Sequence, residues 1–286
     1  MTALTDPSLD TLRAWLASEP AMLVSVRQTQ GSVPREAGTW MAVFAGRVLG
    51  TIGGGHLEFD AIALARAALA GATPLEPARR FALGPSLGQC CGGVVHLGFE
   101  RVQSDGAAAL TLRLQNELDA RRMPVALFGG GHVGRAIVRA LIPLPLRAHW
   151  IDSRDEVFPG GLPLQVQTEH SAPVEAAVRD LAPGSRVLIM SFSHAEDLEI
   201  VAACLTRLRE HDDLPFIGLI GSKSKWATFR RRLEARGFAA EEIARITCPI
   251  GVPGVVGKEP EVIAAAVAAQ LMTLREGPAR SAKGAQ

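Results

Sequence analysis

The chain has 286 residues, of which 48% are hydrophobic and 21% charged, with four cysteines and a formal net charge of +1. This composition excludes a disordered chain and a disulfide scaffold, and no apolar run approaches the ~20 residues that a membrane span needs. The near-zero charge gives no reason to expect nucleic acid or an acidic membrane surface as a partner, and the first residues lack the pattern of a signal peptide. We expect a cytoplasmic protein with two domains.

The first part of the chain predicts a small, mostly antiparallel α+β domain over residues 1–103. An amphipathic helix is expected over residues 8–18, strands over 22–28, 39–44, 47–52, 79–83 and 94–102, and a helix over 61–70. Only Ala45 and Gly46 separate the second and third of these strands, which predicts a hairpin.

A glycine cluster lies between the hairpin and the helix of this domain. It consists of Gly53, Gly54 and Gly55, and the helix then opens with His56 and Glu58. Because a helix start presents unpaired N–H groups and a partial positive charge, this turn is a candidate anion site. Arg35, in the polar loop over residues 29–38, is expected near it. Glu58 is favourable in a first helical turn whatever else it does.

Two adjacent thiols, Cys90 and Cys91, lie in a glycine-rich loop near the end of this domain. Zinc is poorly supported there, because the C-x-x-C spacing is absent. A soft metal or a sulfur ligand is one interpretation, and a buried, inert pair in a tight turn is the other. Cys204, on an apolar helix face, is expected in the core.

The pattern changes after a linking helix, which is expected within residues 104–122. From residue 123 to 275, apolar strands alternate with helices, which predicts an α/β, Rossmann-like domain with a parallel sheet covered on both faces. The strands are expected over 125–128, 146–151, 186–190 and 216–219, and the helices over 132–141, 173–181, 195–209, 223–236 and 259–275. Residues 276–286 are expected to form a disordered tail.

The first strand of this domain runs into the glycine pattern G-x-G-x-x-G. Gly129 is expected to make the turn, Gly131 to let the backbone approach a ligand, and Gly134 to pack helix against strand. Gly130 and His132 lie inside the same turn. With a strand before it and a helix after it, this unit is predicted to hold a phosphate or pyrophosphate at the helix start.

Polar residues follow the other strands, and in a parallel sheet these strand ends meet at one edge. Asp152 and Arg154 follow the second strand. The carboxylate suits a ribose hydroxyl, as in NAD sites, whereas the guanidinium suits the extra phosphate of NADP. The third interpretation is that Asp152 caps a helix or turn. His194 follows the third strand, where an acid/base or ligand residue is one interpretation and a helix-capping or solvent-bonded histidine is the other. His132 lies in the first helical turn, where direct contact with the ligand is one of two interpretations. Ser222 and Lys223 follow the fourth strand, suited to a phosphate but lacking a full P-loop.

Together these motifs resemble the XdhC/CoxI family over nearly the whole chain. The resemblance rests on Gly31-Ser-Val-Pro-Arg35, Gly50-Thr-Ile-Gly-Gly-Gly-His-Leu-Glu58, Cys91-Gly-Gly93, Phe128-Gly-Gly-Gly-His-Val-Gly134, Ile217-Gly-Leu-Ile-Gly-Ser222-Lys223 and Cys248-Pro-Ile-Gly251. Several ordered motifs are more specific than the glycine pattern alone.

The resemblance implies a chaperone for the molybdenum cofactor, an accessory protein rather than an enzyme. Such a protein binds molybdopterin, protects it while a cysteine desulfurase supplies sulfur to the molybdenum, and hands it to the xanthine dehydrogenase apoenzyme. The two glycine turns are then expected to anchor one cofactor jointly, with Cys90 and Cys91 as soft neighbours or ligands of the metal. A homo-oligomer such as a dimer is also expected.

Two stretches depart from the family. The family often shows a Thr-His-Asp-His type run after the third Rossmann strand, whereas this chain has Ser191-Phe-Ser-His194, so that only His194 and Asp197 carry over. Residues 251–260 are less polar than expected. The alternatives from other classes are an NAD(P)-dependent oxidoreductase with His194 as the proton donor, and a nucleotide-binding regulatory domain without chemistry.

Overall fold

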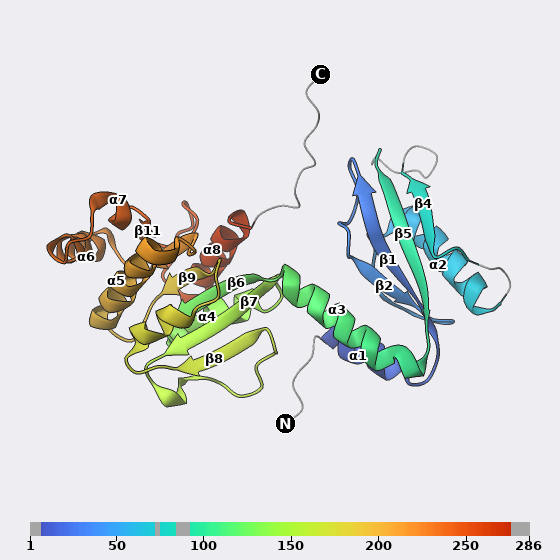
Figure 1. The fold of residues 1–286 in the computed structure, drawn as a ribbon, viewed down its shortest axis with the longest axis horizontal. Coiled ribbons are helices and arrows are strands. Elements are labelled where there is room, and N and C mark those ends of the chain that lie inside the picture. Colours follow the sequence, from blue (N-terminus) through green and yellow to red (C-terminus); the bar gives the residue numbers. More distant parts are fainter. Residues whose placement is uncertain (1–6, 72–74, 84–91, 276–286) are drawn as a thin grey trace, which may run out of the picture. The chain divides into compact units, whose positions relative to one another are not determined.

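The computed structural model describes residues 7–71, 75–83 and 92–275, and its contacts divide the chain between Ala120 and Arg121 into two compact units. Figure 1 shows an antiparallel sheet in the first unit and a parallel sheet covered by helices in the second. The predicted α/β class, with a Rossmann-like second domain, is therefore confirmed. Within the described residues, no helix is long and apolar enough to cross a membrane.

The N-terminal unit is a five-stranded antiparallel sheet in the order β3-β2-β1-β5-β4. Its elements are α1 (Pro7–Leu16), β1 (Ala21–Gln30), β2 (Trp40–Val43), β3 (Val48–Gly50), α2 (Gly55–Leu69), β4 (Ala78–Ala82), β5 (Val94–Val102), the 3-10 turn η2 (Ser104–Gly106) and α3 (Ala107–Arg121). Side chains alternate along β1, so Val24 packs in the cluster of α2 and Leu23 in the cluster of α1 and α3.

Helix α3 is part of the N-terminal core. Its Leu110 and Leu114 lie one turn apart on one face and pack in the same buried cluster as Leu9 and Leu12 of α1. The helix predicted as a link therefore also covers one face of the N-terminal sheet.

The C-terminal unit has six parallel strands in the order β11-β10-β9-β6-β7-β8. The strands are β6 (Met123–Phe128), β7 (Leu146–Asp152), β8 (Val166–His170), β9 (Arg186–Ile189), β10 (Phe216–Leu219) and β11 (Ile246–Thr247). The helices are α4 (His132–Leu141), α5 (His194–His211), α6 (Lys223–Ala235), α7 (Ala240–Ile243) and α8 (Pro260–Thr273), with 3-10 segments η3 (Asp155–Val157) and η4 (Val174–Asp180).

Two hydrophobic cores cover the two faces of this sheet. Ala126 and Phe128 of β6 point into the core of α5, α6 and η4, while Val125 and Leu127 point into the core of α4 and α8. A central strand that is buried on both faces needs a continuous apolar run, which is why β6 was predicted from the sequence.

Two features of this unit differ from the prediction. The edge strands β8 and β11 were not expected, because β8 is largely exposed and β11 has only two residues, so neither carries an apolar run. The segment predicted as an α-helix over residues 173–181 is the 3-10 helix η4. Its buried residues Val174, Ala177 and Val178 have a spacing that suits either kind of short helix.

Candidate functional site

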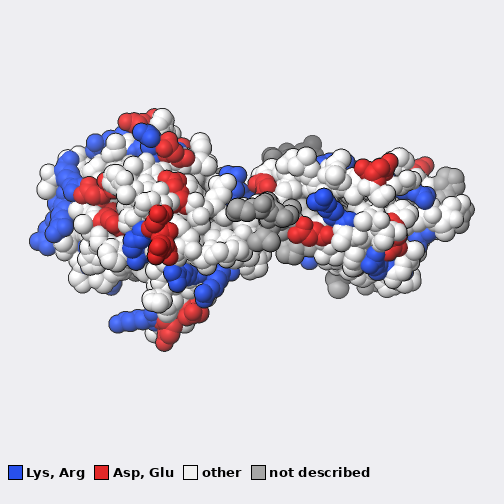
Figure 2. Space-filling model, turned by 90° about the horizontal axis from the view of Figure 1, so that it is seen from below, with Lys and Arg blue, Asp and Glu red and all other residues white. Residues whose placement is uncertain are grey.

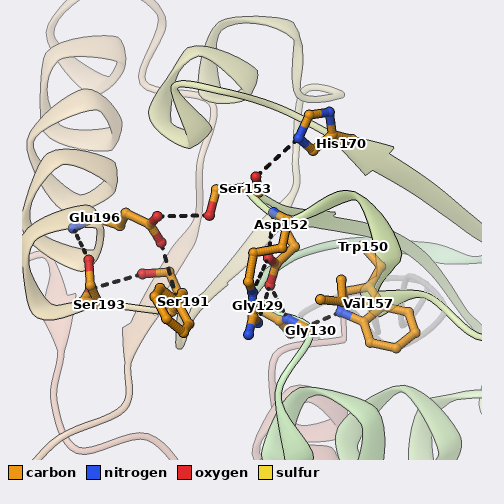
Figure 3. A network of polar contacts seen from close by, with 12 residues as sticks. Gly129, Gly130, Trp150, Asp152, Ser153, Val157, His170, Ser191, Ser193 and Glu196 are labelled. Atoms are coloured by element: carbon orange, nitrogen blue, oxygen red, sulfur yellow. Dashed lines mark hydrogen bonds and ion pairs between the residues drawn. The ribbon is translucent and has the colours of Figure 1, made fainter.

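The candidate site is the carboxyl edge of the parallel sheet, where β10, β9, β6 and β7 lie side by side. Each of these strands ends in one of the polar or glycine-rich segments predicted to converge, and the strand order places all four at this edge. Figure 3 shows the polar contacts that join Gly130, Asp152, Ser153 and Glu196 there. We call this edge the rim.

The glycine turn after β6 is closely packed against its neighbours. Gly129 has a φ of 129°, and a Cβ there would overlap the carbonyl oxygen of Met190 at the end of β9. A Cβ on Gly134 would overlap the carbonyl oxygen of Gly129, which also accepts a hydrogen bond of 2.9 Å from Trp150 Nε1. These two positions require glycine because the backbones approach too closely for any side chain.

The last residue of the turn, Gly131, is open instead. Gly131 is the N-cap residue of α4, no side chain caps this helix, and, apart from its two chain neighbours, no described residue comes within 4 Å of a Cβ placed on Gly131. The first N–H groups of a helix have no partner within it, so the start of α4 offers donors and a partial positive charge beside this space. His132, the next residue, is exposed. This is the arrangement that a phosphate group needs.

Asp152, at the end of β7, is only 2% exposed, and both of its carboxylate oxygens are engaged. Oδ2 accepts from the N–H of Gly130 and from Arg154 Nη2 at 3.0 Å, and Oδ1 accepts from the N–H and Nε of Arg154, each at 2.9 Å. Burial by itself would raise the pKa of Asp152, but these hydrogen bonds and the charge of Arg154 together lower it. A ribose hydroxyl would have to displace these donors.

Further contacts tie the loop after β7 to α5. Ser153 Oγ donates to Glu196 Oε1 at 2.7 Å, and the carbonyl oxygen of Ser153 lies 3.0 Å from His170 Nε2 (Figure 3). Ser193 caps α5 by accepting from the N–H of Glu196 at 3.2 Å. The loops after β7 and β9 are thus held together by side chains.

A buried ion pair under the rim was not predicted. Lys225 Nζ lies 2.5 Å from Asp197 Oδ2 and 2.9 Å from the carbonyl oxygen of Ile220, and the two side chains are 10% and 3% exposed. The signal available in the sequence was spacing: Lys225 lies four residues before the buried Phe229 and therefore on the same face of α6. Ser222 caps α6, and the predicted Lys223 is exposed.

The remaining predicted groups of this unit lie in different environments. His194 opens α5, is exposed, and contacts Phe229 edge-on at 6.3 Å between ring centroids. Cys204 is fully buried, as its helix face predicted, and burial raises the pKa of its thiol to about 12. Cys248 is half-buried after β11, where burial raises the pKa of its thiol, nearby Lys225 lowers it and Asp197 raises it.

The glycine turn of the N-terminal unit holds one of the chain's own carboxylates. Glu58 Oε2 accepts from the N–H groups of Ile52 at 2.9 Å and Gly54 at 3.0 Å and from the hydroxyl of Thr51. Burial would raise the pKa of Glu58, but these hydrogen bonds lower it overall. The N–H of Gly53 is engaged by Thr51 Oγ1 at 3.0 Å.

Gly53, Gly55, His56 and Arg35 around this turn are exposed. A Cβ placed on Gly53 would lie 3.3 Å from Arg35 Cγ, so Arg35 does lie beside the turn as expected. Cys90 and Cys91 lie outside the described residues. Across the described ranges, no cluster of three or more His, Cys, Asp or Glu side chains is arranged to hold a metal ion.

Basic side chains gather on α6, which starts at the rim. Lys223, Arg230, Arg231 and Arg232 are all exposed on this helix. Figure 2 shows basic residues concentrated at the end of the C-terminal unit where α6 lies. The chain therefore has a local basic surface on α6 although its net charge is only +1.

Comparisons with known proteins match both halves of the chain. Residues 125–271 match the XdhC Rossmann domain, and residues 14–81 match the XdhC and CoxI family. A protein of Escherichia coli (strain K12) described as the uncharacterized protein YqeB is 28% identical over 261 residues, which are 90% of this chain and 44% of that protein. The chain thus spans less than half the length of this curated relative.

A solved structure shares the fold. It is a crystal structure described as a xanthine dehydrogenase from Bacillus halodurans, with a TM-score of 0.70, 19% sequence identity, and coverage of 96% of this chain and 98% of that one. At this identity, the likeness supports the arrangement of the elements.

Proposed function

The chain belongs to the XdhC and CoxI family, whose membership implies an accessory role in the maturation of molybdoenzymes, and from this premise we propose that it is a molybdenum cofactor chaperone. In this proposal the protein binds molybdopterin in the cytoplasm, protects it while a cysteine desulfurase supplies the terminal sulfur, and transfers it to a xanthine dehydrogenase apoenzyme. A homo-oligomeric assembly remains a prediction.

The observation that carries this proposal is the open, uncapped start of α4 at Gly131. Molybdopterin has a phosphate group, and the N–H groups of the first turn of α4 are donors suited to it. By contrast, α5 and α6 are capped by Ser193 and Ser222, so their first N–H groups are already partly satisfied. We therefore assign the phosphate to α4, with Gly129, Gly130 and Gly134 shaping the turn and His132 beside it.

The remaining site residues take supporting roles in this proposal. His194, Ser222 and Lys223 lie at the exposed surface of the rim, where they can donate hydrogen bonds to polar groups of the cofactor. In the N-terminal unit, Arg35, Gly53, Gly55 and His56 are exposed at a turn in which Glu58 already accepts from the backbone. When bound, the cofactor supplies a dithiolene-held molybdenum, which suits soft neighbours such as the half-buried thiol of Cys248; Cys90 and Cys91 remain predicted neighbours.

The engaged carboxylate of Asp152 weighs against the NAD(P) alternative. A free acidic group at this position would accept from a ribose hydroxyl, but here both oxygens are bonded to Gly130 and Arg154. The guanidinium of Arg154, which would meet an extra phosphate in NADP, is held by the same carboxylate.

The test compares ligand retention by the wild-type chain and by Gly131→Ala. The backbone at Gly131 has φ −72°, which alanine adopts, and space surrounds the new methyl group, so only the poorer N-cap preference of alanine should lower the unfolding temperature, by no more than about 4 °C. The methyl group should hinder the phosphate and raise the Kd for molybdopterin about tenfold, the effect of ~1.4 kcal/mol. The measurement is retention of molybdopterin, and separately of NAD, through a desalting column.

Gly160→Ala is the matched control, because Gly160 is also in the C-terminal unit and, apart from its chain neighbours, no described residue comes within 4 Å of its Cβ position. It should bind molybdopterin like the wild-type chain. Retained NAD together with hydride-transfer activity would contradict the chaperone proposal and favour the oxidoreductase.

A further inference from the structure

Phe192 exposes an aromatic ring directly after β9, at the rim. Its exposed fraction is 66%, although removal of a phenyl ring from water lowers the free energy. Single exposed apolar residues are common, so exposure alone does not indicate a binding role. The contacts that hold the ring in place provide the additional evidence.

The backbone around Phe192 is fixed at three successive residues. The N–H of Ser191 donates to Asp197 Oδ1 at 2.8 Å, the N–H of Phe192 donates to Glu196 Oε2 at 3.2 Å, and Ser193 caps α5. Because Asp197 is itself paired with Lys225, these contacts attach the segment to the body of the sheet. The ring is therefore presented to solvent from a well-anchored segment.

Arg154 covers one side of the ring. Its Cζ lies 4.6 Å from the ring centroid, while its Nε and Nη2 are bonded to the two oxygens of Asp152. Asp152 also accepts from the N–H of Gly130. A chain of direct contacts thus runs from the ring of Phe192 through Arg154 and Asp152 to the glycine turn.

One donor of Arg154 is left over. The hydrogen bonds described for its guanidinium use Nε and Nη2, so Nη1 can donate to a ligand atom such as a ring carbonyl oxygen. A phenyl ring and a guanidinium with a spare donor form a suitable surface for a planar nitrogen heterocycle, through offset stacking and one hydrogen bond.

We propose that Phe192 and Arg154 form the stacking surface for the pterin ring of the cofactor whose phosphate binds at the start of α4. This inference rests on the proposed function and extends it, because it separates a phosphate subsite from a ring subsite. Phe192 is then a binding residue, and Asp152 is a positioning residue that acts through Arg154.

The test replaces Phe192 by Leu, which keeps apolar area but removes the ring, and by Tyr, which keeps the ring. The Kd of molybdopterin for the full chain is measured by equilibrium dialysis, with the pterin quantified by its fluorescence after oxidation, and unfolding is followed in parallel. Phe192→Leu should raise the Kd about five- to tenfold, and Phe192→Tyr should stay within about twofold of the wild-type chain. Since the ring is exposed, neither variant should shift the unfolding temperature.

The control is Leu164→Ala, which also removes exposed apolar surface. Leu164 is 41% exposed and precedes β8, so it lies at the amino edge of the sheet, away from the rim. Leu164→Ala should bind molybdopterin with the same Kd as the wild-type chain.

If the wild-type chain binds molybdopterin and Phe192→Leu binds it equally well, the ring subsite is refuted while the phosphate site stands. If the wild-type chain binds no molybdopterin, both proposals are refuted. If it binds NAD instead, and Phe192→Leu weakens NAD binding, the ring subsite would be reassigned to adenine or nicotinamide.

Discussion

Two buried or half-buried carboxylates accept hydrogen bonds from N–H groups that the glycine turns would otherwise offer to a ligand. Glu58 accepts from Ile52 and Gly54 in the N-terminal unit, and Asp152 accepts from Gly130 in the C-terminal unit. Such hydrogen bonds stabilise the turns, and they lower the pKa of both carboxylates. Gly54 at the start of α2 and Gly131 at the start of α4 are both N-cap glycines without a side-chain cap, but the N–H of Gly54 is bonded to Glu58, whereas no such carboxylate contact is described for Gly131.

Asp152→Asn should lower the free energy of unfolding by about 2 kcal/mol, because Arg154 and Gly130 lose a charged acceptor in a buried place. Urea unfolding of the full chain measures this change. Asp155→Asn serves as the control, since the Asp155 side chain is 81% exposed, and it should change little.

The same variant has a defined pH dependence. Because the pKa of Asp152 in the folded protein is lowered from 3.8, its charge stabilises the fold above the unfolded pKa, and this stabilisation is lost as the pH falls through the folded value. The stability difference between wild type and Asp152→Asn should therefore be constant above about pH 5 and narrow at pH values below 3.8. A difference that grew on acidification would contradict the lowered pKa.

At the level of elements, the rim depends on how α5 and α6 are joined. Asp197 near the start of α5 accepts from Lys225 near the start of α6, and also from the N–H of Ser191 after β9. This ion pair thus connects two helices and a strand end beneath the exposed candidate residues His194 and Lys223. The ion pair positions the loops of the rim. The side chain of Asp197 is 3% exposed, so its carboxylate has no oxygen available to a ligand.

Lys225→Met should destabilise the chain by about 3 kcal/mol, because it leaves the buried carboxylate of Asp197 without its cation. Lys223→Met makes the same substitution two residues earlier at an exposed position and should leave the unfolding midpoint unchanged. Adding Asp197→Asn to Lys225→Met should recover part of the loss, and the absence of any coupling in this double-mutant cycle would argue against the pair.

At the scale of the whole molecule, the chain consists of two units with separate cores. Two buried clusters draw only on residues before Ala120, and the other two only on residues after Arg121. The C-terminal unit carries the open α4 turn, the ring of Phe192 and the exposed basic side chains of α6, so the proposed phosphate and ring subsites belong to one folding unit.

A fragment of residues 121–275 should therefore fold by itself. We expect a cooperative urea transition with a midpoint close to one of the transitions of the full chain, because the hydrophobic clusters of this unit contain no residue of the other. A fragment without a cooperative transition would show that the two units stabilise each other.

Local patterns were sufficient to predict the α/β class, the family, the inner strands and the glycine turn, since apolar periodicity and glycine spacing report on neighbours within a few residues. They did not predict the edge strands, whose pairing comes from the sheet rather than from their own side chains. Nor did they show that Asp152 is engaged, that Lys225 is buried or that Phe192 is exposed. Those properties depend on contacts such as Gly130 with Asp152 and Asp197 with Lys225, which lie 22 and 28 residues apart and meet only when the parallel strands align their carboxyl ends.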